Sequence, residues 1–217
     1  MEVFAAMSDR QSARAFLSQP VKRADIEEIF KYAGRAPSAI NLQPWEYVIV
    51  YGEEKDRLVR RLKKAQAESR VSCGPGTENP LPDRFKNRSR RASAVMAPKI
   101  AEMGKEFNPF VEEGSCSFYG APIAIIVTID RIFPKIRYLD VGLSVSYLLL
   151  AAQAKGLATC PIGLISAYAQ DIAAALDIAP NKEVILGIAL GYADPQSPIN
   201  QFKTGRENLD AYLRWYE

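Results

Sequence analysis

A nearly continuous apolar run, FYGAPIAIIVTID from Phe118 to Asp130, constrains the fold of this chain more than any other stretch. A strand that is apolar at almost every position must be covered on both faces, so helices are needed on each side of its sheet. The mixed order of helices and strands along the chain predicts an α+β or α/β domain of three layers. We expect strands at 45–51, 118–130 and 182–193, and helices at 25–33, 53–69, 83–104, 138–158 and 167–180.

Local signals refine these boundaries. Asp25 and Glu28 are spaced as in a capping box, which predicts a helix start at Asp25. The stretch 71–82, VSCGPGTENPLP, is dense in glycine and proline and is typical of an exposed loop. The helix at 138–158 is apolar on most sides, which indicates a central or interface helix. No linker or internal repeat interrupts the chain, so residues 1–217 are expected to form one domain.

Histidine is absent from all 217 residues. This absence excludes Ser-His-Asp and Cys-His catalysis and every metal site built on imidazole. The chain also lacks a GxGxxG turn after a strand and a P-loop, so neither a Rossmann fold nor a nucleotide-binding P-loop is indicated. A bound cofactor of another kind is therefore the economical source of chemistry, and the mild net charge of +3 suits a phosphate-bearing ligand.

The cysteines and the apolar runs indicate the compartment. Cys73, Cys116 and Cys160 form no CxxC pair, so we expect no metal site, and their odd number favours a reduced cytoplasm. No apolar run is long enough to span a bilayer, so we expect no membrane association. Cys160 has no base to activate it and is expected to be a small packed thiol.

The segment DRQSARAF places Arg10, Ser12 and Arg14 at alternating positions. Two guanidiniums and a hydroxyl at this spacing suit a phosphate or an anionic ring edge, because arginine offers a fixed fork of donors. From spacing alone, a solvated basic N-terminal helix is the better interpretation. The tail segment NQFKTGREN, with Lys203 and Arg206 around a glycine, suits either an anion site or a surface loop.

Two loops offer further polar groups. In the first, Ser38, Asn41 and Gln43 precede the strand at 45–51, and this pattern fits a ligand contact and ordinary turn chemistry about equally. The second loop is TCPIGLIS at 159–166. Its glycine and proline are expected to hold the loop open, with the backbone N–H groups of 162–164 facing a ligand. The alternative is a plain connection between two helices. The basic run Arg84–Arg91 favours a solvated helix face, so we expect no nucleic acid partner.

These clusters, in this order, resemble the FMN-dependent nitroreductase family. Its members typically begin with Arg-x-Ser-x-Arg/Lys-x-Phe, which residues 10–16 match. They continue with Ala-Pro-Ser-x-x-Asn-x-Gln-Pro-Trp, matched at 36–45 with Ala39 where a second serine is frequent. A Gly-Leu-x-x-Cys-Pro-x-Gly segment follows at 156–163, then a Gly-Tyr pair at 191–192 and a basic loop at 203–206, so the resemblance covers about 10–206.

The resemblance implies an α+β fold of three layers, with a central mainly antiparallel sheet flanked by helices and an intertwined homodimer. It implies FMN with its phosphate on Arg10, Ser12 and Arg206, joined by Lys203. Arg14 would lie at the pyrimidine edge of the ring and the backbone of 162–164 at its N5 side. Ser38 and Asn41 would come from the partner chain. The full set of implied contacts is Arg10, Gln11, Ser12, Arg14, Pro37, Ser38, Ala39, Asn41, Gln43, Pro161, Ile162, Gly163, Leu164, Lys203 and Arg206.

By the same resemblance the chain is an oxidoreductase that passes hydride from NADH or NADPH through FMN to a nitroaromatic, quinone or similar flat acceptor in ping-pong fashion. No side chain is expected to act as acid or base; Arg14 gives electrostatic support. Residues 71–118 would form a variable substrate wall or lid. Two alternatives stay open: a specialised relative, such as a dehalogenase or ene-reductase, and a flavin-binding redox sensor without fast turnover.

Overall fold

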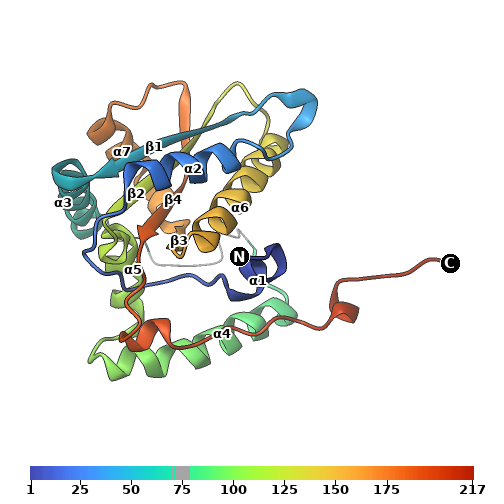
Figure 1. The fold of residues 1–217 in the computed structure, drawn as a ribbon. Helices are drawn as coiled ribbons and strands as arrows, with labels where there is room; N and C mark the ends of the chain where they lie inside the picture. Colours follow the sequence, from blue (N-terminus) through green and yellow to red (C-terminus); the bar gives the residue numbers. More distant parts are fainter. Residues whose placement is uncertain (70, 72–78) are drawn as a thin grey trace.

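The computed structural model describes residues 1–69, 71 and 79–217 (Figure 1). Its strands form one antiparallel sheet in the order β1-β2-β4-β3. This arrangement confirms the expected α+β architecture. The strands are β1 Trp45–Tyr51, β2 Ile123–Asp130, β3 Ala158–Ile162 and β4 Lys182–Gly191, and the helices are α1 Val3–Asp9, α2 Arg23–Ala33, α3 Gly52–Glu68, α4 Asp83–Glu102, α5 Phe107–Cys116, α6 Tyr138–Ala154 and α7 Ala169–Leu176.

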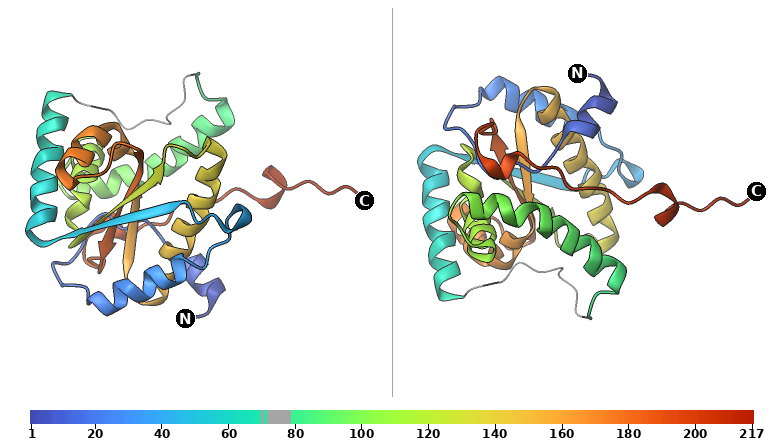
Figure 2. Two further views of the ribbon diagram at one scale, coloured as in Figure 1. Left: turned by 90° about the horizontal axis from the view of Figure 1, so that it is seen from above. Right: turned by 90° about the horizontal axis from the view of Figure 1, so that it is seen from below.

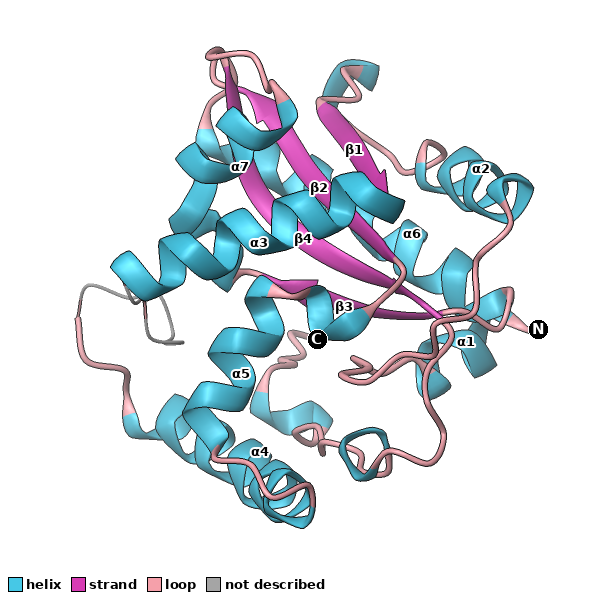
Figure 3. Cartoon of the chain, turned by 90° about the vertical axis from the view of Figure 1, so that its left-hand side faces the viewer, coloured by secondary structure: helices cyan, strands magenta, loops and turns pink. Residues whose placement is uncertain are grey.

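The expected three layers are present. In Figure 3, α3 and α7 lie in front of the sheet and α6 lies behind it. Alternate residues of β2 point to opposite faces, so Ala124 and Ile126 join one buried cluster and Ile125 and Val127 the other. The first cluster includes side chains of α3, α5 and α7, and the second those of α2 and α6. All of β2 except Asp130 is buried, which is why its sequence is apolar throughout.

Several expected boundaries were wrong. The strand expected at 118–130 begins only at Ile123, and the helix expected at 138–158 ends at Ala154. The loop expected at 159–166 contains most of strand β3. Its proline is tolerated because β3 is the last strand of the sheet, and the N-terminal segment bridges its free side at Thr159 rather than at Pro161. Helix α5 was not expected at all, although it buries Phe110 and Cys116. Helix α2 begins at Arg23, two residues before the expected capping box.

Asp25 and Glu28 do not cap α2. Instead both carboxylates pair with Nζ of Lys155, at 2.9 and 2.5 Å, and this joins α2 to the end of α6. The expected loop at 71–82 lies largely outside the described residues. Among the residues that the structure does describe, no helix combines the length and the hydropathy needed to cross a bilayer.

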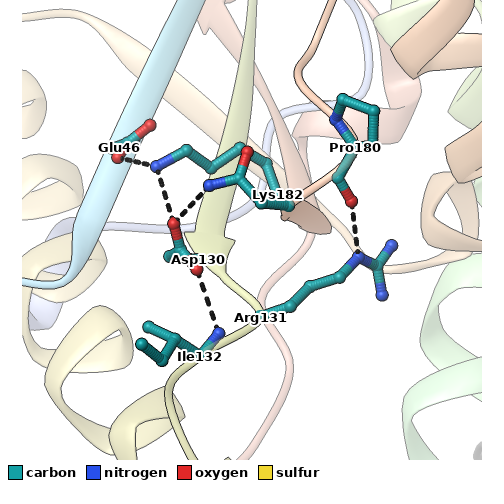
Figure 4. A network of polar contacts seen from close by, with 7 residues as sticks. Glu46, Asp130, Arg131, Ile132, Pro180 and Lys182 are labelled. Atoms are coloured by element: carbon teal, nitrogen blue, oxygen red, sulfur yellow. Dashed lines mark hydrogen bonds and ion pairs between the residues drawn. The ribbon is translucent and has the colours of Figure 1, made fainter.

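An ion network ties three neighbouring strands together at one end of the sheet (Figure 4). Nζ of Lys182, at the start of β4, pairs with Asp130 of β2 at 3.4 Å and also with Glu46 of β1. Asp130 also accepts the backbone N–H of Ile132 at 3.0 Å. Because the groups come from β1, β2 and β4, the network holds the register of this end of the sheet.

The C-terminal segment runs alongside α4 and then leaves the body of the molecule (Figures 1 and 2). The α4 helix contacts the short 3-10 turn Pro198–Asn200, which precedes this segment. Beyond it the chain exposes large apolar side chains: Leu209 is 61% exposed, Trp215 79% and Tyr216 90%. The segment therefore offers an apolar surface that the rest of the described chain leaves uncovered.

Candidate functional site

The N-terminal segment at 10–16 is extended rather than helical, because α1 ends at Asp9. Ser12 forms a parallel bridge with Thr159 of β3, and Phe16 an antiparallel bridge with Ala193. Backbone bonds secure both ends, from Ala13 N to Thr159 O at 3.0 Å and from Leu17 N to Tyr192 O at 2.9 Å. The interpretation as a basic N-terminal helix was therefore wrong. In an extended segment, alternate side chains share a side, which brings those of residues 10, 12 and 14 together.

Asn200 joins this segment to the C-terminal part of the chain. Its Oδ1 accepts the backbone N–H of Arg14 at 2.8 Å, and its Nδ2 donates to Ala15 O at 2.8 Å and to Asp194 O at 2.9 Å. Its backbone carbonyl accepts from Nε2 of Gln11 at 2.9 Å. One asparagine thus fixes the path of 11–15.

A cavity of about 290 Å³ opens between the two joined segments. One acid lines this cavity, Asp9, and its Oδ1 lies 3.8 Å from Nζ of Lys203. Four cationic side chains line the same cavity, those of Arg10, Arg14, Lys203 and Arg206. Arg206 donates to the carbonyls of Thr204 and Gly205, which folds it back along its own loop. The cavity is strongly cationic and suits a phosphate. It collects six of the predicted residues: Arg10, Gln11, Ser12, Arg14, Lys203 and Arg206.

Gln11 carries an unsatisfied polar atom at this cavity. Its Nε2 donates to Asn200, which fixes the orientation of the side-chain amide. Oε1 is then buried without a hydrogen-bond partner among the described residues. A buried acceptor left in this state costs about 1–3 kcal/mol. A ligand hydroxyl beside the phosphate would satisfy it, and the ribityl chain of FMN carries such hydroxyls, so the residues present fit this cofactor.

Arg14 also lines a second cavity of about 620 Å³, formed by the N-terminal segment, α5 and the turn before β2. Its guanidinium donates to Ser12 O at 3.3 Å and lies 6.0 Å from the ring centroid of Tyr119. Burial raises the pKa of Tyr119, so the phenol is neutral near Arg14 at physiological pH. The arginine therefore keeps its charge free for a ligand at the junction of the two cavities.

The segment Pro161–Leu164 approaches this region as the end of β3. Ser12 bridges Thr159, and Ile162 follows about 10 Å further along the strand. Gly163 is exposed and precedes the 3-10 helix Leu164–Tyr168, whose first N–H groups have no acceptor within the helix. The N–H groups expected to face a ligand, those of 162–164, thus lie at a strand end and a helix start. Neither cavity described above includes 161–164 in its wall.

The polar loop before β1 lies apart from both cavities. Ile40, Asn41 and Gln43 have positive φ angles of 43, 60 and 47°, which non-glycine residues seldom adopt and which are often kept at binding sites. Ser38 Oγ accepts the backbone N–H of Gln43 at 3.0 Å, so Ser38 does contribute turn chemistry. The side chain of Asn41 has no partner within the described chain and is exposed. Pro37 and Ala39 flank these groups.

Sequence reasoning missed Asn200, Thr159 and Tyr119. Ser197-Pro198 signals a turn ahead of Asn200, but nothing in the sequence shows that its amide bonds the N-terminal segment. Cys160, in contrast, is the packed thiol that was expected: it is 2% exposed, and burial raises its pKa. It therefore remains protonated at neutral pH and is a poor nucleophile.

Comparison with known proteins identifies the family of this chain. The family model described as the nitroreductase family matches residues 7–192. A 4-nitrobenzoate reductase of Pseudomonas putida is 30% identical over 97% of this chain and 94% of its own length. The nitroreductase NfnB of Mycolicibacterium smegmatis is 32% identical over 95% of this chain and 89% of its own. A crystal structure of the FMN-dependent NfnB from Mycobacterium smegmatis in complex with NADPH superposes with a TM-score of 0.89 at 28% identity, covering all of both chains.

Proposed function

The chain belongs to the nitroreductase family, and we propose that it holds FMN in the cationic cavity between its N-terminal segment and its tail loop. The protein is an FMN-dependent oxidoreductase that uses NAD(P)H to reduce nitroaromatic compounds. Bound FMN supplies the hydride chemistry, which is why the chain needs no histidine. The residues of the chain itself bind the flavin, orient it and polarise its ring.

The observation that carries this proposal is the set of four cationic side chains that line one cavity, whose wall also includes Gln11 with its unsatisfied Oε1. We assign Arg10, Ser12 and Arg206, with Lys203, to the phosphate, because all four residues line one cavity. Gln11 then accepts from a ribityl hydroxyl. Arg14, at the junction with the larger cavity, supports negative charge on the pyrimidine edge of the ring.

The backbone at Ile162–Leu164, preceded by Pro161, is assigned to the N5 side of the ring. The support is its position on β3 beside Ser12. A nicotinamide and a nitroaromatic, quinone or other flat acceptor would occupy the same face in turn, giving ping-pong kinetics.

We propose a homodimer with the flavin sites at its interface. Helix α6 exposes Leu139 and Tyr147, at 62 and 43%, and the tail exposes Trp215. A second copy of the chain would cover these apolar side chains. In such a dimer the loop of Pro37, Ser38, Ala39, Asn41 and Gln43 would reach the partner's flavin. Its distance from the chain's own cavities and its strained backbone support this role.

Residues 1–217 are proposed to form one FMN-binding domain, in which α4 and α5 belong to the variable substrate wall at 71–118. A cytoplasmic location is proposed as well; both described cysteines, Cys116 and Cys160, are free and buried.

The test starts from the absorption spectrum of the purified protein. We expect a yellow protein that releases FMN on denaturation and bleaches when NADH or NADPH is added without oxygen. Addition of 4-nitrobenzoate should then restore the oxidised spectrum. An Arg14→Gln variant should retain FMN yet bleach about ten- to a hundredfold more slowly, while Arg35→Gln, an exposed change outside both cavity walls, should behave as wild type.

A colourless protein that cannot be reconstituted with FMN would overturn the proposal. A yellow protein that neither nicotinamide bleaches would favour the flavin-binding sensor instead.

A further inference from the structure

The basic run Arg84–Arg91 on α4 has no role in the site described above, yet it borders a third cavity. This cavity, of about 920 Å³, lies between α4 and the tail loop. It shares Thr204 and Arg206 with the cationic cavity, so the two adjoin. Figure 2 shows the two segments side by side.

Two arginines of this cavity are held in place before any ligand arrives. Nε of Arg88 lies 3.5 Å from Oε1 of Glu207, and Arg91 pairs with the same carboxylate. The guanidinium of Arg88 also lies 5.3 Å from the ring centroid of Phe85. Side chains ordered in this way lose less entropy when they bind a ligand.

The charges at the third cavity do not balance. Glu207 is the acid in its wall, whereas Arg88, Arg91 and Arg206 each carry a positive charge. Because Arg206 is assigned to the FMN phosphate, Arg88 and Arg91 against Glu207 leave an excess of one positive charge, which favours an anionic group such as a phosphate monoester. Ala92, Val95 and Tyr212 give the same wall an apolar part, suited to a nucleoside.

We propose that this cavity binds the adenosine 2′-phosphate of NADPH, with Arg88 and Arg91 contacting the phosphate. The inference rests on the proposed function and deepens it, because it makes NADPH the preferred electron donor. NADH carries a 2′-hydroxyl at this position and cannot form the charge-assisted hydrogen bonds. The shared wall places the adenosine end of the donor beside the FMN phosphate, and the nicotinamide end would extend toward the ring.

The test uses the holoenzyme and two soluble probes. Adenosine 2′,5′-bisphosphate, which carries the 2′-phosphate, should bind at least tenfold more tightly than ADP in titration calorimetry. Arg91→Ser should weaken binding of the bisphosphate about tenfold, equivalent to ~1.4 kcal/mol. It should raise the NADPH concentration needed for half-maximal rate of flavin bleaching by a similar factor and leave the NADH value unchanged.

Arg90→Ser is the matched control. Arg90 lies on the same helix and carries the same charge, but its Nη1 donates to Asn87 at 3.1 Å and it does not line the cavity. We expect this substitution to leave the affinities for both probes unchanged. Arg91→Lys keeps the charge but loses the planar fork of donors. Its affinity for the bisphosphate should lie between those of Arg91→Ser and wild type.

Equal affinity for the two probes, or equal effects of Arg91→Ser and Arg90→Ser, would overturn the inference. In that case bleaching by NADH would leave the proposed function intact. Failure to bind FMN, or to bleach with either donor, would instead overturn the proposed function.

Discussion

The backbone N–H of Arg14 donates to Oδ1 of Asn200 at 2.8 Å, across 186 residues of sequence. The bond sets the position at which Arg14 leaves the N-terminal segment, and so where its guanidinium stands between two cavities. Asn200 thus acts as a positioning residue.

Replacement of Asn200 by alanine removes three side-chain hydrogen bonds and leaves backbone groups at Arg14, Ala15 and Asp194 without these partners. We expect a loss of about 2–3 kcal/mol in the free energy of unfolding and at least a tenfold loss of FMN affinity. Urea unfolding and flavin titration of the apoprotein measure both. Gln201→Ala is the control, since its side chain bonds only Pro195 and Gln196 nearby. Similar behaviour of the two variants would contradict the role of Asn200.

The phosphate assignment of Arg206 predicts a difference between FMN and riboflavin. Arg206→Ala should weaken FMN about tenfold or more, because a charge-assisted contact is lost, and should leave the affinity for riboflavin unchanged. Fluorescence titration of the apoprotein with each flavin measures the ratio. Lys64→Ala, at an exposed pair with Glu68, serves as the control. An equal loss of affinity for both flavins would contradict the assignment of Arg206 to the phosphate.

Gly114 is required by the ring of Tyr119. A Cβ at this glycine would lie 2.3 Å from Cε1 of the tyrosine, so Gly114→Ala forces the ring or α5 to move. We expect a loss of about 1–3 kcal/mol in the free energy of unfolding. Chemical denaturation of a double-mutant cycle with Tyr119→Leu tests the cause, because removing the ring should relieve most of the cost of the alanine. Additive effects would show that this contact is not the source.

The buried phenol of Tyr47 predicts that the folded protein loses stability at alkaline pH. Burial raises its pKa to about 12, whereas an unfolded tyrosine titrates near 10. The folded state thus binds more protons between these values, and its stability is fully present below pH 10 and is lost as pH rises toward 12. Tyr47 should account for a loss of about 1.4 kcal/mol by pH 11.

Tyr47→Phe loses the hydrogen bond to Ser144, at 2.7 Å, and should cost about 1 kcal/mol at pH 7. The cost should shrink and then reverse as pH approaches 11, which denaturant titrations at several pH values would reveal. A constant difference between the two proteins would contradict the assignment.

Asp130 predicts sensitivity at the opposite end of the pH scale. The N–H of Ile132 and the ammonium of Lys182 hold the pKa of this carboxyl below its usual value near 3.8. Its stabilisation is present above that value and disappears as pH falls through the lower folded pKa. Asp130→Asn should therefore flatten the decline of the melting temperature between pH 5 and 3, with Asp56→Asn as an exposed comparison.

Much of this architecture follows from the sequence. The buried run 123–129 identified a sheet covered on both faces, and the order of the motifs along the chain identified the family. Strand β3 was missed because Pro161 indicates a loop unless the strand is known to lie at an edge. The first turn of α2 was misplaced because Asp25 and Glu28 pair with Lys155, which is distant in sequence.

Within the candidate site, the sequence predicted residue types suited to phosphate, whereas it did not predict the residues that position them. Asn200 acts through bonds across the whole chain, and no local pattern reveals such a contact. The basic run on α4 was read as a solvated surface because its cavity exists only when the tail loop lies beside it.

The walls of the cationic cavity come from residues 7–12, 14, 202–204 and 206, which lie near opposite ends of the sequence. Contacts of this kind close late, because a long chain segment must be ordered before they form. A flavin held in this cavity would therefore bind only a nearly finished structure, and it would stabilise that structure against unfolding. A shift of the flavin absorption spectrum away from that of free FMN in a refolding sample would report the final step of chain closure.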